Sequence, residues 1–557
     1  MDAETRPENA PLRKDPLAWF AMALAVLLAA GFFTLTWRTG DDARYIGLAR
    51  SLLEGKGFAK SYLPHDPPET ITPPAQPALI AGAMLVFGRG VVPGQLASVA
   101  MFLLGTLAIY AWARRRLGDP ILAFCATVMG QFSMAVLTMS CWYMVEMHYI
   151  ASSFAAVWLA ERGPRARGAL ALVFGIGLLS GYVYLVRATG LALAAAGGIY
   201  FLSRRQWKPL VLFGLGFLAL AGPWMLRTYL LTGATEAYLP VQSSMAGEAG
   251  GGYPWGRIPN DIATAFPVYF VQALPDALFY RLFGEFGLTG KLGLSSIDPL
   301  LRFGLLGLIL LGFASRLRRP AFGDWYWIFY WLIITAPPFP PQGHWYVYPV
   351  LPMAAVYVAT AIRVLTAGAA RISARVPPRR VVRVAFAGLA AYTLATAVTG
   401  AWVHWGKERQ RAGLAPWAPE RYTTYRNEYM DAWGRMVEAA LWVQSNCPPD
   451  TLVASRQPNH VYLITGREGW RYDLGEVPGT NLFDRMRRQA DTRPVVLIED
   501  SFSSYSGASF SYGVAHWALR DLFASHAEAM EKIYETGVPV TRVWRYAGPR
   551  GGAKELE

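Results

Sequence analysis

Charged residues and cysteines are both scarce in this sequence. Only 16% of the 557 residues are charged, against roughly 25% in soluble domains, while 54% are hydrophobic. This shortage of charge excludes a soluble enzyme as the description of the whole chain and indicates a membrane protein. Three cysteines, of which two lie in or beside hydrophobic runs, are too few for a disulfide framework.

Residues 405–557 lack the motifs of common soluble enzymes. They contain no glycine-rich nucleotide motif, Walker loop, metal-ligand spacing or nucleophile elbow. Short hydrophobic strand patterns alternate there with helical patterns, which predicts an α/β soluble domain with a small, mostly parallel sheet. We expect this domain to position the chain or bind an acceptor rather than to carry the chemistry. The expected strands are 451–455, 494–499 and 540–546, and the expected helices are 432–446, 483–489 and 515–525.

The net charge of +14 belongs entirely to residues 1–404, because residues 405–557 carry 19 basic and 19 acidic side chains. The basic excess lies in short connections between hydrophobic runs, and Arg-rich connections alternate with connections poor in Arg and Lys. This alternation follows the positive-inside rule, so no nucleic-acid partner is expected. It predicts a multi-pass protein of the inner or plasma membrane, with a cytoplasmic N-terminus and an extracytoplasmic C-terminal domain.

The hydrophobic runs predict about eleven transmembrane helices in a transmembrane domain over residues 1–404. That domain includes a first external loop at 38–93 and a long external loop at 227–298, which is either a lid or a structural cover. The short hydrophobic segment 75–88 is expected to be a re-entrant or surface helix. The expected spans are 17–37, 94–113, 119–138, 146–160, 168–186, 189–203, 209–226, 299–314, 325–340, 345–366 and 381–402.

The stretch 40–77 follows the first span and reads GDDARYIGLARSLLEGKGFAKSYLPHDPPETITPPAQP. Hydrophobic residues recur in it at helical spacing from Tyr45 to Leu53, and glycines and prolines then end the helix. The pattern predicts a short amphipathic helix at the membrane surface with Asp41 and Asp42 at its start. One interpretation makes Asp41 a helix N-cap, and the other makes it a functional carboxylate.

A membrane helix followed at once by Gly-Asp-acid-x-x-Tyr-x-x-x-Ala resembles the first external loop of C-type (GT-C) membrane glycosyltransferases. The resemblance is to the protein O-mannosyltransferase and lipid A aminoarabinose transferase branch. It implies that Asp41 is the catalytic base and that the donor is a sugar linked to polyprenyl phosphate. It also implies an extracytoplasmic acceptor, which could be protein, lipid or polysaccharide. Asp42, the second candidate for a catalytic residue, stands where the family usually has Glu. Arg44 and Tyr45 of the same motif are expected to bind substrate.

Further candidates for substrate binding lie where hydrophobic runs end. Arg187 is predicted to contact the lipid phosphate or to hold a carboxylate, because Arg within a membrane segment is rarely idle. Glu146 either orients the sugar or forms a structural ion pair with Arg187. Arg227 either binds phosphate or extends to lipid headgroups. His344 and Tyr346 begin a segment, HWYVYPVLP, that resembles a conserved family segment in which Arg usually occupies the His position.

The seven histidines show no metal-ligand spacing, and no cofactor is expected. A divalent metal held by His65 and Asp66 together with Asp41 is the alternative that the first loop leaves open. Two other functions compete with glycosyl transfer. One is a transporter or lipid flippase that uses the same charged residues, although no inverted repeat is visible. The other is a non-catalytic scaffold whose soluble domain binds cell-wall components.

Overall fold

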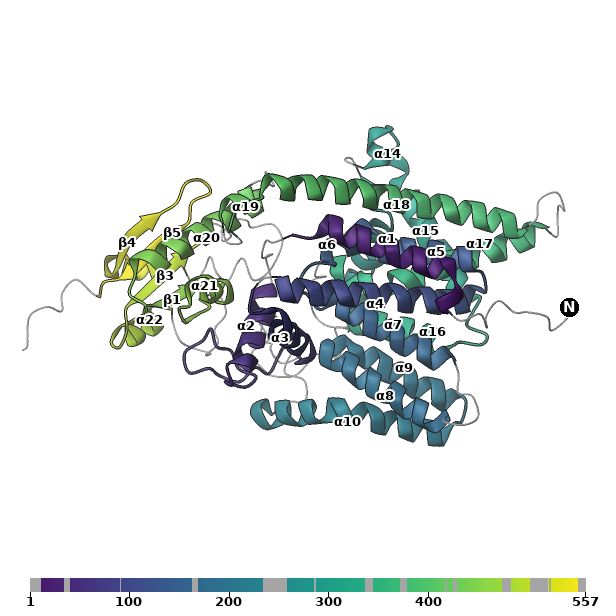
Figure 1. Cartoon of the computed structure of the whole chain (residues 1–557), viewed down its shortest axis with the longest axis horizontal. Coiled ribbons are helices and arrows are strands. Elements are labelled where there is room, and N and C mark those ends of the chain that lie inside the picture. The colour runs from purple at the N-terminus through teal and green to yellow at the C-terminus, as the bar shows by residue number, and fades with distance from the viewer. Residues whose placement is uncertain are drawn as a thin grey trace, which may run out of the picture. The chain divides into compact units, whose positions relative to one another are not determined.

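The computed structural model describes residues 12–34, 41–90, 92–162, 169–233, 258–284, 287–335, 344–370, 378–415, 418–423, 428–472, 482–500, 519 and 522–548. The chain divides into two compact units, each described by itself below (Figure 1). The helical unit comprises Met1–Phe33, Thr70–Gln76 and Gln95–Gly406. The sheet unit comprises Thr34–Glu69, Pro77–Gly94 and Lys407–Glu557.

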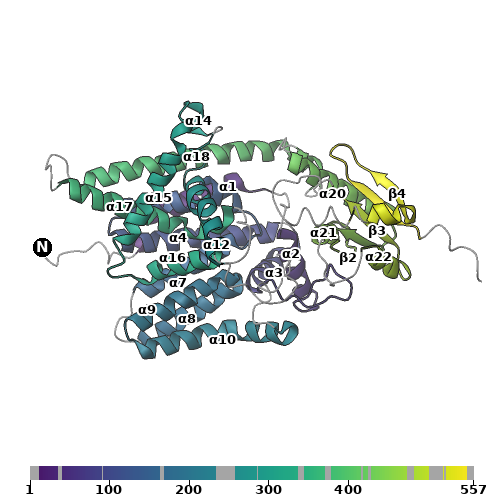
Figure 2. The same ribbon diagram turned by 180° about the vertical axis from the view of Figure 1, so that it is seen from behind.

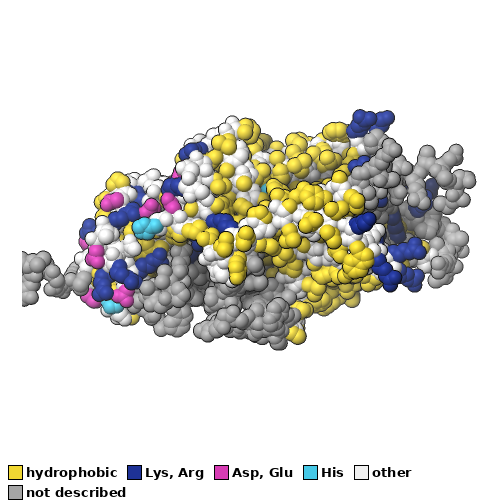
Figure 3. Space-filling model, turned by 90° about the horizontal axis from the view of Figure 1, so that it is seen from below, with side chains coloured by type: hydrophobic (Ala, Val, Ile, Leu, Met, Phe, Trp, Pro, Cys, Tyr) yellow, Lys and Arg dark blue, Asp and Glu magenta, His cyan; other side chains and the backbone are white. Residues whose placement is uncertain are grey.

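Hydrophobic helices build the helical unit. Among the described residues, five helices are long and hydrophobic enough to cross a membrane, and shorter hydrophobic helices accompany them. Figure 3 shows hydrophobic side chains covering much of the helical surface, and Trp207, Leu230, Val384 and Trp402 are among the exposed ones. This surface is typical of helices that face lipid. The helices are α1 (Pro16–Phe32), α4 (Val92–Leu117), α5 (Pro120–Gln131), α6 (Met134–Met139), α7 (Glu146–Arg162), α8 (Ala169–Val186), α9 (Leu191–Ser203), α10 (Trp207–Thr232), α12 (Ile258–Phe266), the π-helix η5 (Pro267–Ala273), α13 (Leu274–Leu278), α14 (Leu288–Lys291), α15 (Asp298–Ala314), α16 (Phe322–Thr335), η7 (His344–Val350), α17 (Leu351–Ala370) and α18 (Pro378–Gln410).

The predicted span 119–138 is divided into two helices. Helix α5 ends at Gln131, and α6 begins at Met134 after Ser133, whose hydroxyl accepts a hydrogen bond from the backbone nitrogen of Val136. A serine side chain that caps a new helix ends the preceding one, although the sequence on both sides stays hydrophobic.

The segment 75–88 forms helix α3 (Ala75–Phe87), whose last residues Leu85, Val86 and Phe87 are exposed.

Helices α8, α9 and α10 lie side by side in the helical unit (Figure 2). Glycines let α8 and α10 approach closely: a Cβ atom on Gly177 would lie 2.2 Å from the carbonyl oxygen of Phe213, and one on Gly216 would lie 2.3 Å from that of Phe174. Small residues of this kind allow backbone contact between helices in membranes.

Replacing Gly216 by Ala is therefore expected to destabilise the helical unit by about 1–3 kcal/mol, because the new methyl group meets backbone rather than a side chain that can move. Gly214, on the same helix, has no atom within 4 Å of the corresponding Cβ position, so Gly214→Ala is the matched control. Thermal unfolding in detergent is expected to show a lower Tm for Gly216→Ala only. Equal Tm values for the two variants would contradict the close packing.

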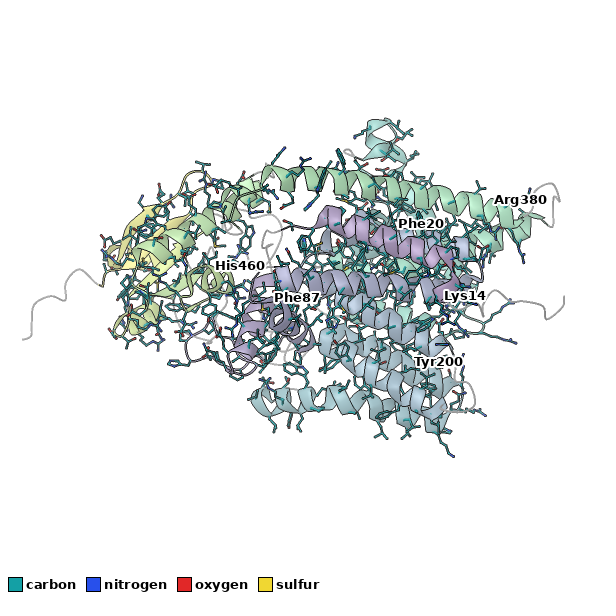
Figure 4. All side chains as sticks on the ribbon, viewed as in Figure 1. Lys14, Phe20, Phe87, Tyr200, Arg380 and His460 are labelled. Carbon is teal, nitrogen blue, oxygen red and sulfur yellow. The ribbon has the colours of Figure 1, made fainter. Side chains whose placement is uncertain are left out.

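A buried ion network joins helix ends on one side of the helical unit. Arg116 near the end of α4 contacts Glu161 near the end of α7 at 3.1 Å and Asp324 in the first turn of α16 at 2.7 Å. Figure 4 shows Lys14 and Arg380 at one end of this unit, together with Tyr200. Tyr200 lines a cavity with Arg116 and Glu161, so the ion network belongs to the same end. The charge pattern predicts that the C-terminal ends of α4 and α7 are cytoplasmic. In the structure these two helix ends lie on the same side of the helical unit.

The sheet unit is built on a five-stranded sheet of order β2-β1-β3-β5-β4. Strand β1 pairs in parallel with β2 and β3, whereas β5 pairs antiparallel with β3 and β4, so the sheet is mixed rather than mostly parallel. Strands β4 and β5 are joined by a short turn, which permits only antiparallel pairing. The strands are β1 (Leu452–Ser455), β2 (Gly469–Trp470), β3 (Val495–Glu499), β4 (Met530–Glu535) and β5 (Arg542–Tyr546).

The predicted strands 451–455, 494–499 and 540–546 correspond to β1, β3 and β5. The predicted helix 515–525 lies mainly outside the described residues. Side chains alternate between the two faces of the sheet: Leu452 and Leu497 point to one hydrophobic core, and Val453 and Val496 point to the other. The helices of this unit are α2 (Asp42–Leu53), α19 (Glu420–Thr423), α20 (Glu428–Asn446), α21 (Pro458–Thr465) and α22 (Leu482–Ala490).

Candidate functional site

Asp41 immediately precedes helix α2 and is exposed. Its backbone carbonyl accepts the amide of Tyr45, but its side chain makes no capping hydrogen bond. Asp42, in contrast, is buried, with only 1% of its surface exposed. Tyr45 and Leu48 of the predicted hydrophobic stripe are buried, whereas the end of the stripe at 52–53 is partly exposed. The carboxylate of Asp41 is thus accessible to a substrate, whereas that of Asp42 belongs to the interior.

Arg44 is held by a carboxylate of the same loop. Its guanidinium donates to both oxygens of Glu69 at 3.0 Å, and Glu69 is fully buried. Burial lowers the pKa of Arg44, but the charges of Glu69, Tyr62 and Asp41 together with the hydrogen bonds to Glu69 outweigh burial, so the pKa lies above its ordinary value. Arg44 therefore fixes a positive charge near Asp41 and ties α2 to the end of the loop. Its predicted contact with substrate stays a prediction.

The loop after α2 is folded rather than merely connecting. The amide of Lys60 donates to the carbonyl of Pro67, and the amide of Glu69 donates to that of Phe58. His65 and Asp66, the residues of the alternative metal site, both have positive φ, and Asp66 lies 3.4 Å from the amine of Lys56. Within the described part of the chain, no group of three or more His, Cys, Asp or Glu is placed to hold a metal.

This loop packs into the core of the sheet unit. Tyr62 and Leu63, which are 8% and 5% exposed, join one hydrophobic core with Trp470 and strand β1. The backbone nitrogen of Gly469 donates to the carbonyl oxygen of Tyr62 at 2.9 Å, and helix α2 packs against α21. The sequence assigned residues 38–93 to the transmembrane domain. In the structure most of that loop belongs to the same compact unit as residues 407–557.

Three of the predicted substrate-binding residues meet in the helical unit. Arg187, directly after α8, lies 3.3 Å from a carboxylate oxygen of Glu146, the first residue of α7. The guanidinium also lies over the ring of Tyr346 in η7, 4.4 Å from its centroid. Tyr330 of α16 donates to the backbone carbonyl of Tyr346 at 2.7 Å and so fixes that segment.

The electrostatics of this group explain why its members lie together. Glu146 is 1% exposed and the side chain of Arg187 is 14% exposed, so each charge needs a partner in the interior. An aromatic face adds attraction for the guanidinium. The five N–H donors of an Arg form a fork that matches phosphate oxygens, so a guanidinium oriented by Glu146 and Tyr346 has the chemistry of a phosphate site.

A further polar network was not predicted from the sequence. His148 contacts the side-chain oxygen of Gln76 through Nδ1 at 2.9 Å and the hydroxyl of Tyr182 through Nε2 at 2.8 Å. Gln76 donates to the carbonyl of Tyr143 at 2.7 Å. These residues are far apart in the sequence and follow no spacing, so only the fold reveals the network.

The remaining predicted residues lie elsewhere. Arg227 lies on α10, where its guanidinium stacks over the ring of Trp224 at 5.2 Å from the centroid. The side chain of His344 lies outside the described residues, although η7 begins at that position.

No protein-family model matches this sequence, and no curated protein matches it. Solved structures do match in fold. The structure of ArnT from Cupriavidus metallidurans bound to undecaprenyl phosphate is 13% identical, with a TM-score of 0.59, and the alignment covers 96% of this chain and 100% of that one.

Oligosaccharyltransferases of the archaeon Archaeoglobus fulgidus match as well. The structure of AglB in complex with an inhibitory peptide and a dolichol-phosphate is 15% identical, with a TM-score of 0.52, covering 98% of this chain and 75% of that one. A complex of the A. fulgidus oligosaccharyltransferase with Zn and sulfate is 15% identical, with a TM-score of 0.51, covering 95% and 73%. The resemblance to C-type membrane glycosyltransferases, read from the first loop, is confirmed in the fold of nearly the whole chain.

Proposed function

We propose that this protein is a membrane glycosyltransferase that moves a hexosyl or pentosyl residue from a polyprenyl-phosphate carrier to an extracytoplasmic acceptor. The observation that carries the proposal is the fold shared over 96% of the chain with a structure that holds undecaprenyl phosphate. The dolichol-phosphate and peptide in an AglB structure support the same classes of donor and acceptor. The Asp41 motif adds support that is independent of the fold comparison.

The proposed reaction is a displacement at the anomeric carbon. Asp41 removes the proton of an acceptor hydroxyl while that oxygen forms a bond to the anomeric carbon. The bond between the anomeric carbon and the phosphate oxygen breaks, and polyprenyl phosphate leaves with the bonding electrons. The exposed position of Asp41 and its lack of a capping hydrogen bond support this role.

Arg187 is assigned to the lipid phosphate. Its charge would stabilise the negative charge that develops on the leaving phosphate. Glu146 and Tyr346 would orient the guanidinium, as their distances of 3.3 Å and 4.4 Å support. Arg227 and His344 remain further proposed contacts for the donor. The proposed mechanism contains no step that uses a metal. A divalent ion is the alternative, because one of the similar oligosaccharyltransferase structures is a complex with Zn.

Arg187→Met is expected to weaken binding of undecaprenyl phosphate about 10–100-fold, since hydrogen bonds to charged groups contribute about 1.5–3 kcal/mol. Arg187→Lys should recover part of the affinity, because Lys keeps the charge but lacks the fork. Arg319→Met removes an exposed Arg and is the control. Titration of each purified variant with the lipid, together with its Tm, checks the prediction. Unchanged affinity in Arg187→Met would make the residue purely structural.

The membrane arrangement proposed for this function has about eleven spans, a cytoplasmic N-terminus and an extracytoplasmic C-terminal domain. The five long hydrophobic helices and the helix ends gathered around Arg116 support it. A cysteine introduced at the exposed position Arg488 is expected to react with a membrane-impermeant reagent from outside the cell. Reaction only after the membrane is opened would contradict the orientation.

A further inference from the structure

A cavity of about 530 Å³ lies in the helical unit where α4, α5, α17 and α18 meet. It is separate from the Glu146–Arg187 group, since it lies where α4 ends and α5 begins and contains neither residue. Figure 4 labels Arg380 near the start of α18. Arg380 directly follows Arg379, which lines the cavity. The cavity is lined by Leu117, Gly118, Asp119, Pro120, Leu122, Arg363, Thr366, Arg379, Val382 and Arg383.

The charges around this cavity do not balance. Among the described residues, three arginines and a single carboxylate, that of Asp119, line it. One oxygen of Asp119 accepts the backbone amides of Ile121 and Leu122 at the start of α5. The other oxygen is held by Arg383, at 2.9 Å from Nε and 2.8 Å from a terminal nitrogen.

Arg363 and Arg379 form no ion pair with a described carboxylate, although the charge of Asp119 attracts Arg363 from further away. Of the described Asp and Glu side chains, none lies within 4 Å of either guanidinium, while Arg363 is half-buried beside the cavity. Like charges around one cavity repel each other, and an anion inside it would remove that repulsion. The planar forks of Arg match a phosphate group.

We propose that this cavity binds the phosphate of an anionic membrane-lipid headgroup. Its position favours a lipid over a free ion, because the cavity lies at the ends of α4, α17 and α18, which are long enough to cross a membrane. Leu117, Leu122 and Val382 supply a hydrophobic part of the wall, which suits the glycerol and acyl-chain start of a lipid. Basic pockets between transmembrane helices recognise lipid headgroups in this way. A lipid bound there would anchor the protein in the membrane or regulate it. This proposal does not depend on the proposed glycosyltransferase function.

The test uses the full-length protein in nanodiscs of phosphatidylcholine with increasing phosphatidylglycerol. The wild type is expected to show a rising Tm and bound phosphatidylglycerol by native mass spectrometry. The double variant Arg363→Gln/Arg379→Gln is expected to bind phosphatidylglycerol about 30-fold more weakly, at about 1 kcal/mol for each Arg. Arg318→Gln/Arg319→Gln removes two exposed charges outside the cavity and is expected to bind as the wild type does.

Arg379→Gln alone provides a second test, because Arg379 is exposed and its loss leaves the packing intact. It is expected to weaken binding about fivefold. Equal weakening in the cavity variant and the control variant would overturn the site. Stabilisation of the wild type by inorganic phosphate to the same extent as by phosphatidylglycerol, lost in the double variant, would overturn the lipid as the occupant.

Discussion

Asp41→Asn is expected to lower the rate of sugar transfer about 10²–10⁴-fold, the usual contribution of a general base. An amide of the same shape cannot take the acceptor proton. The Tm should stay close to that of the wild type, because the side chain of Asp41 makes no capping hydrogen bond and is exposed. Transfer from a polyprenyl-phosphate sugar by the purified variant, measured beside its thermal unfolding, separates the two effects.

Asp42→Asn is the matched comparison. Because Asp42 is only 1% exposed in the first turn of α2, its replacement should act mainly on stability and lower the Tm. Near-normal transfer by Asp41→Asn, with transfer abolished in a well-folded Asp42→Asn, would assign the base to the second carboxylate. Normal transfer by both variants would contradict the mechanism.

Trp470→Ala is expected to reduce transfer more than tenfold, although residues 405–557 carry no catalytic motif. Trp470 is 1% exposed and shares a core with Tyr62 and Leu63 of the loop that follows Asp41. Truncating a buried Trp costs about 3–5 kcal/mol, enough to release that loop from the sheet. Hydrogen exchange of residues 54–69 should rise together with the loss of transfer.

Trp442→Ala is the control for this prediction. Trp442 is half-buried on the opposite face of the same sheet, where its ring stacks on Tyr534 with the centroids 4.8 Å apart. Its loss should leave the exchange of residues 54–69 and the transfer rate near normal. Unchanged exchange and transfer in Trp470→Ala would mean that the sheet does not position the loop.

Local patterns were enough to predict several parts of the molecule. The periodicity of residues 45–53 predicted helix α2 and the burial of Tyr45 and Leu48, because a helix buries residues that recur every three or four positions. The end of the stripe, at 52–53, is only partly buried. The possible pairing of Arg187 with Glu146 followed from the cost of an isolated charge in a membrane segment, and the two side chains do lie 3.3 Å apart. Hydrophobic runs such as 494–499 predicted the central strand β3.

Features that depend on contacts between residues far apart in the chain could not be predicted from the sequence. Strand β4 reads MEKIYE, and its charged residues give no hydrophobic strand pattern. These charges are tolerated because β4 pairs with β5 at the edge of the sheet, where one face of the strand lies in water. The packing of Tyr62 and Leu63 on the sheet joins segments about 400 positions apart, which no local pattern records. The loop that follows Asp41 belongs to the same compact unit as residues 407–557, which the sequence did not indicate. That the soluble domain is an accessory to the chemistry stays a prediction.

The most direct test of the proposed function is the release of polyprenyl phosphate. Purified wild-type protein would be incubated with a polyprenyl-phosphate sugar and candidate acceptors in detergent, beside Asp41→Asn. Glycosyl transfer predicts that free polyprenyl phosphate appears in a one-to-one ratio with transferred sugar, and that Asp41→Asn releases about 10²–10⁴-fold less. Movement of the intact lipid-linked sugar across a reconstituted bilayer, with no polyprenyl phosphate released under any acceptor condition, would contradict a transferase and indicate a transporter.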